Sequence, residues 1–179
     1  KSGFGAAGAE SENVGVGKDS LFDVTTGSGN VALGVESAYN ISSGGESVAV
    51  GKQALYTATT VGANTAVGYQ ALKLNAVASN TAVGHSAGLN TTGTLNTYVG
   101  SSAGLGAAGA DANNVGVGSN ALLAITAGSN NVAIGISAGA TFTNASDVVL
   151  IGRSAGTAIT TNAADGTVAI GSQALVDLT

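Results

Sequence analysis

Few side chains in this sequence have the types and spacing that catalysis requires. His85 is the single histidine and cysteine is absent, so a Ser–His–acid arrangement has one possible base and a thiol nucleophile has no candidate. No supporting motif surrounds His85, which follows Gly84 at a predicted exposed corner. We therefore interpret His85 as a solvated surface residue and expect no catalytic group.

The ten acidic residues are scattered through predicted loops and corners. They are Glu10, Glu12, Asp19, Asp23, Glu36, Glu46, Asp111, Asp147, Asp165 and Asp177. Asp23, Asp147 and Asp165 could each touch a cation, but the Gly-Gly-x-Gly-x-Asp repeat typical of calcium-binding rolls is absent. Solvated surface acids are the default interpretation, so we expect no metal site.

Cofactor binding and enzymatic activity lack sequence support as well. The segment 104–109 has the Gly-x-Gly-x-x-Gly spacing of dinucleotide-binding loops, but the strand–helix–strand context of that motif is missing. An enzyme such as a polysaccharide lyase on a β-helix needs a groove with clustered acids and bases, which the sequence does not provide. We expect no cofactor and no enzyme.

One short row of residues is a candidate for surface contact. Tyr69 and His85 occupy the same phase of successive repeats, and Lys52 occupies that phase one repeat earlier. In a stacked repeat protein the three become axial neighbours, and such a row could bind a sugar or a protein. The alternative, which we favour, is that the three are ordinary surface residues without a ligand, because single exposed aromatic residues are common on protein surfaces.

Composition narrows the classes of partner. The net charge is −5, charged residues make up 8%, and no basic cluster is present, which argues against nucleic acid and against an anionic membrane surface. No apolar run approaches the roughly 20 residues of a membrane-spanning helix. Apolar residues make up 44% and recur at regular positions, which predicts a core of small residues rather than disorder.

The element that must position these residues is a five-residue sequence motif that occurs ten times. Its clearest copy is Asn-Val-Ala-Ile-Gly at 131–135. A fixed period of 16 to 19 residues indicates a repeat architecture. The closing glycines are Gly17, Gly34, Gly51, Gly68, Gly84, Gly100, Gly118, Gly135, Gly152 and Gly171. Seven repeats carry asparagine four residues earlier: Asn13, Asn30, Asn64, Asn80, Asn96, Asn114 and Asn131.

Alternation around each glycine predicts strands. The residue three before the glycine is β-branched in all ten repeats, and the residue one before is always aliphatic. Apolar residues resume three and five positions after the glycine, which predicts a second short strand per repeat. Recurrent glycine costs about 1 kcal/mol per helical position, so a helical repeat is excluded. A meander of hairpins is harder to exclude.

Identical residues at identical phase favour a parallel β-solenoid over that meander. We therefore predict an all-β fold: a single β-solenoid domain over residues 1–179, with about ten coils in a rod roughly 50 Å long. The asparagines can hydrogen-bond along such a stack and can start a turn, so we favour a structural role for them over ligand binding. Segment 3–10 matches 104–111, so the domain starts and ends in mid-repeat.

The first strand predicts association between chains. One of its faces carries Val and Ile, the other carries Asn, Ala and Gly, and the sequence does not decide which faces inward. A thin coil buries only one face, and we expect a flat strip of small residues to remain as an interface. The uncapped ends allow two hypotheses, an excerpt of a longer fibre or an end-to-end filament.

The segments 64–72 and 131–135 resemble the head repeats of YadA-type trimeric autotransporter adhesins, and they are similar to repeats of phage tail fibres and bacterial surface fibres. The resemblance implies a left-handed parallel β-roll, a parallel trimer around one axis, and binding to a host surface. The adhesin repeats are shorter, nearer 14 residues, and the adhesins' coiled-coil stalk and membrane anchor are not present in this sequence.

These observations together predict a structural and adhesive extracellular fibre, or filament subunit, that attaches to a cell-surface or matrix ligand through its variable loops and corners. A phage tail-fibre shaft or receptor-binding segment is the alternative. A monomeric ice-binding solenoid is a further one, because Thr65, Thr81 and Thr97 supply three rungs of a threonine array.

Overall fold

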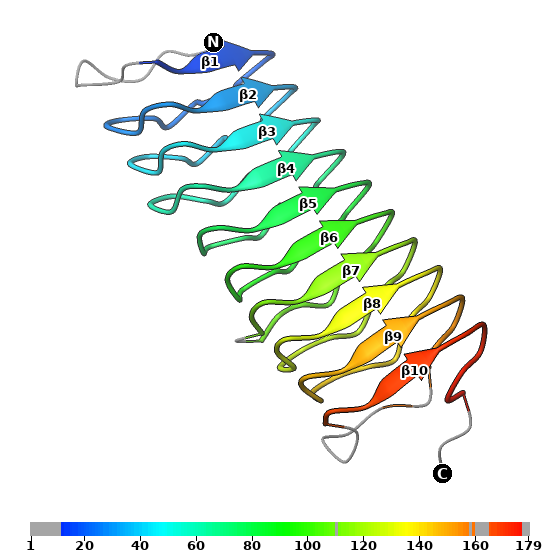
Figure 1. The fold of residues 1–179 in the computed structure, drawn as a ribbon. Coiled ribbons are helices and arrows are strands. Elements are labelled where there is room, and N and C mark those ends of the chain that lie inside the picture. Colours follow the sequence, from blue (N-terminus) through cyan, green and yellow to red (C-terminus); the bar gives the residue numbers. More distant parts are fainter. Residues whose placement is uncertain (1–11, 110, 158, 160–164, 177–179) are drawn as a thin grey trace.

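The computed structural model describes residues 12–109, 111–157, 159 and 165–176. Over these residues the chain winds into a β-solenoid with one three-residue strand per coil (Figure 1). The strands are β1 (Val14–Val16), β2 (Val31–Leu33), β3 (Val48–Val50), β4 (Thr65–Val67), β5 (Thr81–Val83), β6 (Thr97–Val99), β7 (Val115–Val117), β8 (Val132–Ile134), β9 (Val149–Ile151) and β10 (Val168–Ile170). They form one parallel sheet in sequence order, which confirms the predicted parallel β-solenoid and excludes the meander of hairpins.

Each rung of the sheet stacks a residue on its counterpart in the next repeat. Thr65 pairs with Thr81 and Thr81 with Thr97, and the same in-phase pairing holds for every adjacent pair of strands. The variation in repeat length is absorbed in the loops between strands, where insertions disturb no ladder hydrogen bond. The coils therefore stack along a single axis, as the repeat period predicts.

The predicted second strand of each repeat is not formed in the described part of the chain. After Gly17, Asp19 and Leu21 have φ values of 55° and 50°, and the equivalent residues of the later coils are also left-handed. A β-strand needs negative φ, so this segment is a series of turns, although it still bonds to its neighbour: the Leu21 N–H donates to the Ser37 carbonyl at 3.1 Å. Positions three and four after the glycine are both buried, as Ser20 and Leu21 show, so strand alternation fails here.

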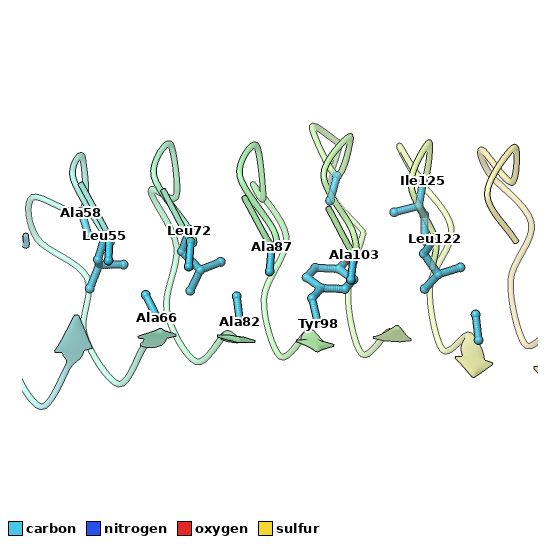
Figure 2. Packing of buried hydrophobic residues seen from close by; sticks show 14 of the residues in the cluster. Leu55, Ala58, Ala66, Leu72, Ala82, Ala87, Tyr98, Ala103, Leu122 and Ile125 are labelled. Atoms are coloured by element: carbon cyan, nitrogen blue, oxygen red, sulfur yellow. The ribbon is translucent and has the colours of Figure 1, made fainter. Parts of the chain in front are cut away.

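The core is a narrow column between the strands and these turns. Ala66, Ala82 and Tyr98 point from their strands into this column, and Leu72 and Leu122 enter it from the opposite wall (Figure 2). The two walls are close enough that alanine at the strand centre and leucine opposite fill the space. Burial of these apolar side chains is the main stabilising term of the fold.

Large side chains in the column are matched by glycine next to them. Tyr98 replaces the usual alanine, and a Cβ added at Gly104 would overlap its ring, while a Cβ at Gly116 would lie 3.1 Å from it. Leu150 is accommodated in the same way, because a Cβ at Gly156 would lie 2.6 Å from its Cδ2. The interior therefore keeps its volume from coil to coil while its residues vary.

Candidate functional site

The main candidate site is the side of the sheet that faces away from the core, and we call it the outward strand face. It comprises the first and last residue of each strand: Val14, Val16, Val31, Leu33, Val48, Val50, Thr65, Val67, Thr81, Val83, Thr97, Val99, Val115, Val117, Val132, Ile134, Val149, Ile151, Val168 and Ile170. All twenty are exposed or half-buried, and none carries a charge. Val16 and Ile170, near the two ends, are 59% and 67% exposed.

This arrangement corrects the expectation of an exposed strip of small residues. The structure turns the alanines and asparagines inward and the β-branched residues outward, as in β3, where Ala49 is buried between the half-buried Val48 and Val50. The column between the walls is too narrow for two rows of branched side chains, because the opposite wall already supplies leucine and isoleucine. The surface left in water is therefore bulkier and more apolar than expected.

The asparagines of the repeat are internal connectors. Asn96 is buried; its Oδ1 accepts the N–H of Asn114 at 2.9 Å, its Nδ2 donates to the carbonyl of Asp111 at 3.2 Å, and its own N–H donates to Oδ1 of Asn80 at 2.9 Å. Most of these bonds go to the backbone of the next coil. Among the described residues, side chain–side chain bonds between successive members of the ladder link Asn96, Asn114 and Asn131, while Asn80 donates to Oδ1 of Asn75, which is outside the ladder, at 3.4 Å.

Two departures from asparagine weaken or end this ladder. Ser47 replaces asparagine in the third coil, and its Oγ accepts the N–H of Asn64 at the longer distance of 3.3 Å. Val148 donates its N–H to Asn131 at 3.0 Å but brings no side-chain acceptor for the coil that follows. Because the asparagine amides are occupied by these internal bonds, they are not available to an external ligand.

The corner row predicted from Lys52, Tyr69 and His85 is exposed. The rings of Tyr69 and His85 stack with centroids 5.1 Å apart at 29°. Backbone bonds keep the three residues in axial order, since the Gln70 N–H donates to the Lys52 carbonyl and the Ser86 N–H to the Tyr69 carbonyl. Tyr69 therefore has one ring face against His85, and this face is not available to a ligand.

A second row of side chains, which we call the aromatic row, lies on the turns that follow the closing glycines. The sequence analysis did not predict it as a unit. Phe22, Tyr39 and Tyr56 form a continuous ring stack with centroid separations of 4.9 Å and 5.1 Å, and Lys73 lies 6.0 Å from the Tyr56 centroid. The signal was present, because all four stand five residues after a closing glycine. Partial burial, and secondly the carboxylate of Asp23, raise the pKa of Tyr39.

Asp111 departs from the prediction of solvated acids. It is fully buried, and its Oδ2 accepts the Tyr98 hydroxyl at 2.9 Å, while its Oδ1 has no hydrogen-bond partner in the described part of the chain. Burial raises the pKa of this carboxyl, and the hydrogen bond from Tyr98 opposes part of that effect. The position of Asp111 is equivalent to that of Gly93 and Gly128 in neighbouring coils, because the carbonyl of each accepts the side-chain amide of a ladder asparagine. Where those coils have no side chain, Asp111 places a carboxyl group beside Tyr98.

The remaining acids and glycines add no reactive centre in the part of the chain that the structure describes. Asp23, Asp147 and Asp165 are exposed, and no group of three potential metal ligands occurs among the described residues. Glu10, Asp177 and the segment 3–10 lie outside those residues. Gly104, from the Gly-x-Gly-x-x-Gly segment, makes room for Tyr98 and opens no helix.

No family model, curated protein or solved structure matches the chain. Within the described ranges, the structure has no helix with the length and apolar character needed to cross a membrane.

Proposed function

We propose that this chain is a structural subunit of an extracellular fibre, and that copies of it associate side by side through the outward strand face. The observation that carries the proposal is the uncharged, solvent-facing surface of twenty branched or hydroxyl-bearing side chains on one sheet. Nine intervals of about 4.8 Å make this surface about 43 Å long. A continuous apolar surface of that size is characteristic of an interaction site.

A second copy is the occupant that this surface fits best. Its rungs are evenly spaced and alike, so a parallel copy presents the same spacing and the same branched side chains along its whole length. A charged or deeply contoured partner has nothing complementary to meet there. The resemblance to trimeric adhesin heads supports three copies around one axis, with the corners and loops left outside to contact a cell surface or matrix.

Mechanical stiffness is the activity that such a subunit supplies. Backbone hydrogen bonds run along the axis in both the strands and the turns, for example from Gly34 N–H to the Val16 carbonyl at 2.8 Å and from Glu36 N–H to the Lys18 carbonyl at 2.9 Å. The corner row starts two residues beyond the last strand residue of each coil, and the aromatic row of Phe22, Tyr39, Tyr56 and Lys73 stands on the turns that follow it. These are therefore the surfaces that an assembled fibre would offer for adhesion.

Charge placed on the outward strand face tests the proposal. We expect the native chain to have a multiple of its 16.9 kDa mass by light scattering and to appear as rods in electron microscopy. Ile134→Lys, with Val117→Lys as a second variant, should shift the mass to the monomer, because a desolvated unpaired ammonium is costly. Ser101→Lys, at an exposed corner, is the matched control and should leave the mass unchanged.

A monomeric native chain would contradict self-association. That result would favour the ice-binding alternative, for which the exposed sheet and the adjacent rungs of Thr65, Thr81 and Thr97 are the supporting features. Thermal hysteresis of the monomer, lost in Thr81→Lys, is the measurement that would then distinguish an ice-binding surface from an inert one.

A further inference from the structure

The outward strand face has a polar block at its centre. Its first column, formed by the first residue of each strand, is valine in β1 to β3, threonine in β4 to β6 and valine again in β7 to β10. The three threonines lie on consecutive rungs, since Thr65 pairs with Thr81 and Thr81 with Thr97. The second column, formed by the last residue of each strand, is aliphatic throughout.

The three hydroxyls have no hydrogen-bond partner among the described residues. Other threonines bond to the next coil, as Thr25 does to the Ser42 carbonyl at 3.0 Å, whereas Thr65, Thr81 and Thr97 make no such bond among the described residues. All three are half-buried. Threonine has nearly the shape of valine, so the block differs from the rest of the column by its hydroxyl groups and hardly by its volume.

We propose that Thr65, Thr81 and Thr97 fix the axial register between associated copies of the chain. This inference rests on the proposed association through the outward strand face. When copies pack in register, each threonine meets a threonine, and the hydroxyls can donate and accept among themselves. The same logic applies to a polar residue in an apolar coiled-coil seam, which selects one register.

The repeat makes such a device necessary. Because the rungs are evenly spaced and almost identical, an aliphatic face lets copies slide by whole rungs with an unchanged fit at the rungs that still overlap. A slide of three rungs, about 14 Å, places every threonine against valine. Three buried hydroxyls per chain then lose their partners, which disfavours the offset assembly by more than about tenfold.

Cross-linking at single introduced cysteines measures the register, since the native chain has no cysteine. Val67→Cys in β4 and Val117→Cys in β7 lie three rungs apart in the same column. Chains carrying one or the other, with different mass tags, are unfolded, mixed and refolded together, then treated with a thiol cross-linker much shorter than about 14 Å. Links between like positions report the in-register assembly, and links between Val67→Cys and Val117→Cys report the three-rung offset.

Two variants change the hydroxyl pattern. Thr65→Val/Thr81→Val/Thr97→Val removes the block, and valine suits a strand, so folding should be kept and is verified by circular dichroism. The block-shifted variant adds Val115→Thr/Val132→Thr/Val149→Thr to those changes and thereby moves the block three rungs along the axis. Ser101→Ala and Ser119→Ala, which remove corner hydroxyls, serve as controls.

We expect native chains to link like positions at least about tenfold more than offset positions. The triple valine variant should show that preference clearly reduced, and native Val67→Cys mixed with block-shifted Val117→Cys should form links between the two positions that the unshifted mixture lacks. A register preference that is unchanged without the hydroxyls would overturn this inference while leaving the fibre proposal intact. Native chains that do not assemble would overturn both.

Discussion

Side chains inside the solenoid adjust to one another across neighbouring coils. The residue two before the closing glycine and the residue four after it fill the same space in the core. A small Ala66 is combined with a large Leu72, whereas a large Leu150 is combined with Gly156. Leucine at the later position has positive φ, 48° at Leu72, an unfavourable conformation for a bulky residue. The inter-coil hydrogen bonds on either side hold it there, so local backbone preference gives way to the stacked arrangement.

The buried Asp111–Tyr98 pair is the residue-scale feature with a pH signature. Because burial raises the pKa of Asp111 in the folded chain, the folded state holds that proton more tightly than the unfolded chain does. The contribution of Asp111 to stability is therefore greatest below the ordinary carboxyl range and declines as the pH rises through the folded-state pKa.

Asp111→Asn removes the buried charge and should raise the free energy of unfolding at pH 7.5 by on the order of 1 kcal/mol. The advantage over the native chain should shrink toward pH 3.5, where the native carboxyl is protonated. Urea unfolding at both pH values is the measurement. Asp147→Asn, at an exposed residue, is the control and should show no comparable change. An advantage for Asp111→Asn that does not vary with pH would contradict the assignment.

At the scale of the elements, the closing glycines permit close stacking of the coils. Gly118 has φ of +131°, and a Cβ there would lie 2.5 Å from the Gly135 carbonyl oxygen. Gly171 has nearly the same φ, +132°, but a Cβ there would come no closer than 4.0 Å to a described residue beyond its chain neighbours, the Cβ of Ala174. The two positions therefore separate the steric cost of stacking from the backbone cost of positive φ.

We expect Gly118→Ala to destabilise the chain by several kcal/mol more than Gly171→Ala, because only the first substitution forces two coils apart. Thermal or urea unfolding of the two variants gives the comparison directly. Equal losses would mean that the conformation of the glycine, rather than the approach of the next coil, accounts for its recurrence.

The asparagine ladder offers a gain in stability at the rung of Ser47, where the bond to the next coil is long. Ser47→Asn should add an Oδ1 acceptor for the Asn64 N–H and a donor for the Val61 carbonyl, as Asn30 does for Ser47 and Gly44. We expect an increase of about 0.5–1.5 kcal/mol in the free energy of unfolding. Ser47→Ala should lower it, because the buried Asn64 N–H then has no side-chain acceptor. A loss on Ser47→Asn would show that this coil cannot hold the larger amide.

At the scale of the whole molecule, stability is a sum over coils and their neighbours. Each strand pairs with those directly before and after it, so no long-range closure holds the rod together within the described residues. A rod of this kind tolerates a change in the number of coils but not a change in their phase.

Deleting residues 35–51 removes one full period and joins Gly34 to Lys52 with the phase kept. We expect a folded chain with a native-like circular dichroism spectrum, a sheet about 5 Å shorter and a modestly lower unfolding midpoint. Deleting residues 35–43 removes half a period and should abolish cooperative unfolding. If the full-period deletion unfolded the chain as well, stability would depend on more than neighbouring coils.

The sequence by itself determined the period, the axis and the strand of each coil, because in-phase β-branched residues and glycines leave few other ways to stack. It also carried the aromatic row, whose members share one phase. Only the tertiary structure decided which strand face is buried, since both faces are uncharged and the choice depends on the width of the column between the walls. The turns that replace the second strand, and the burial of Asp111 beside Tyr98, likewise depend on contacts between coils that no single repeat contains.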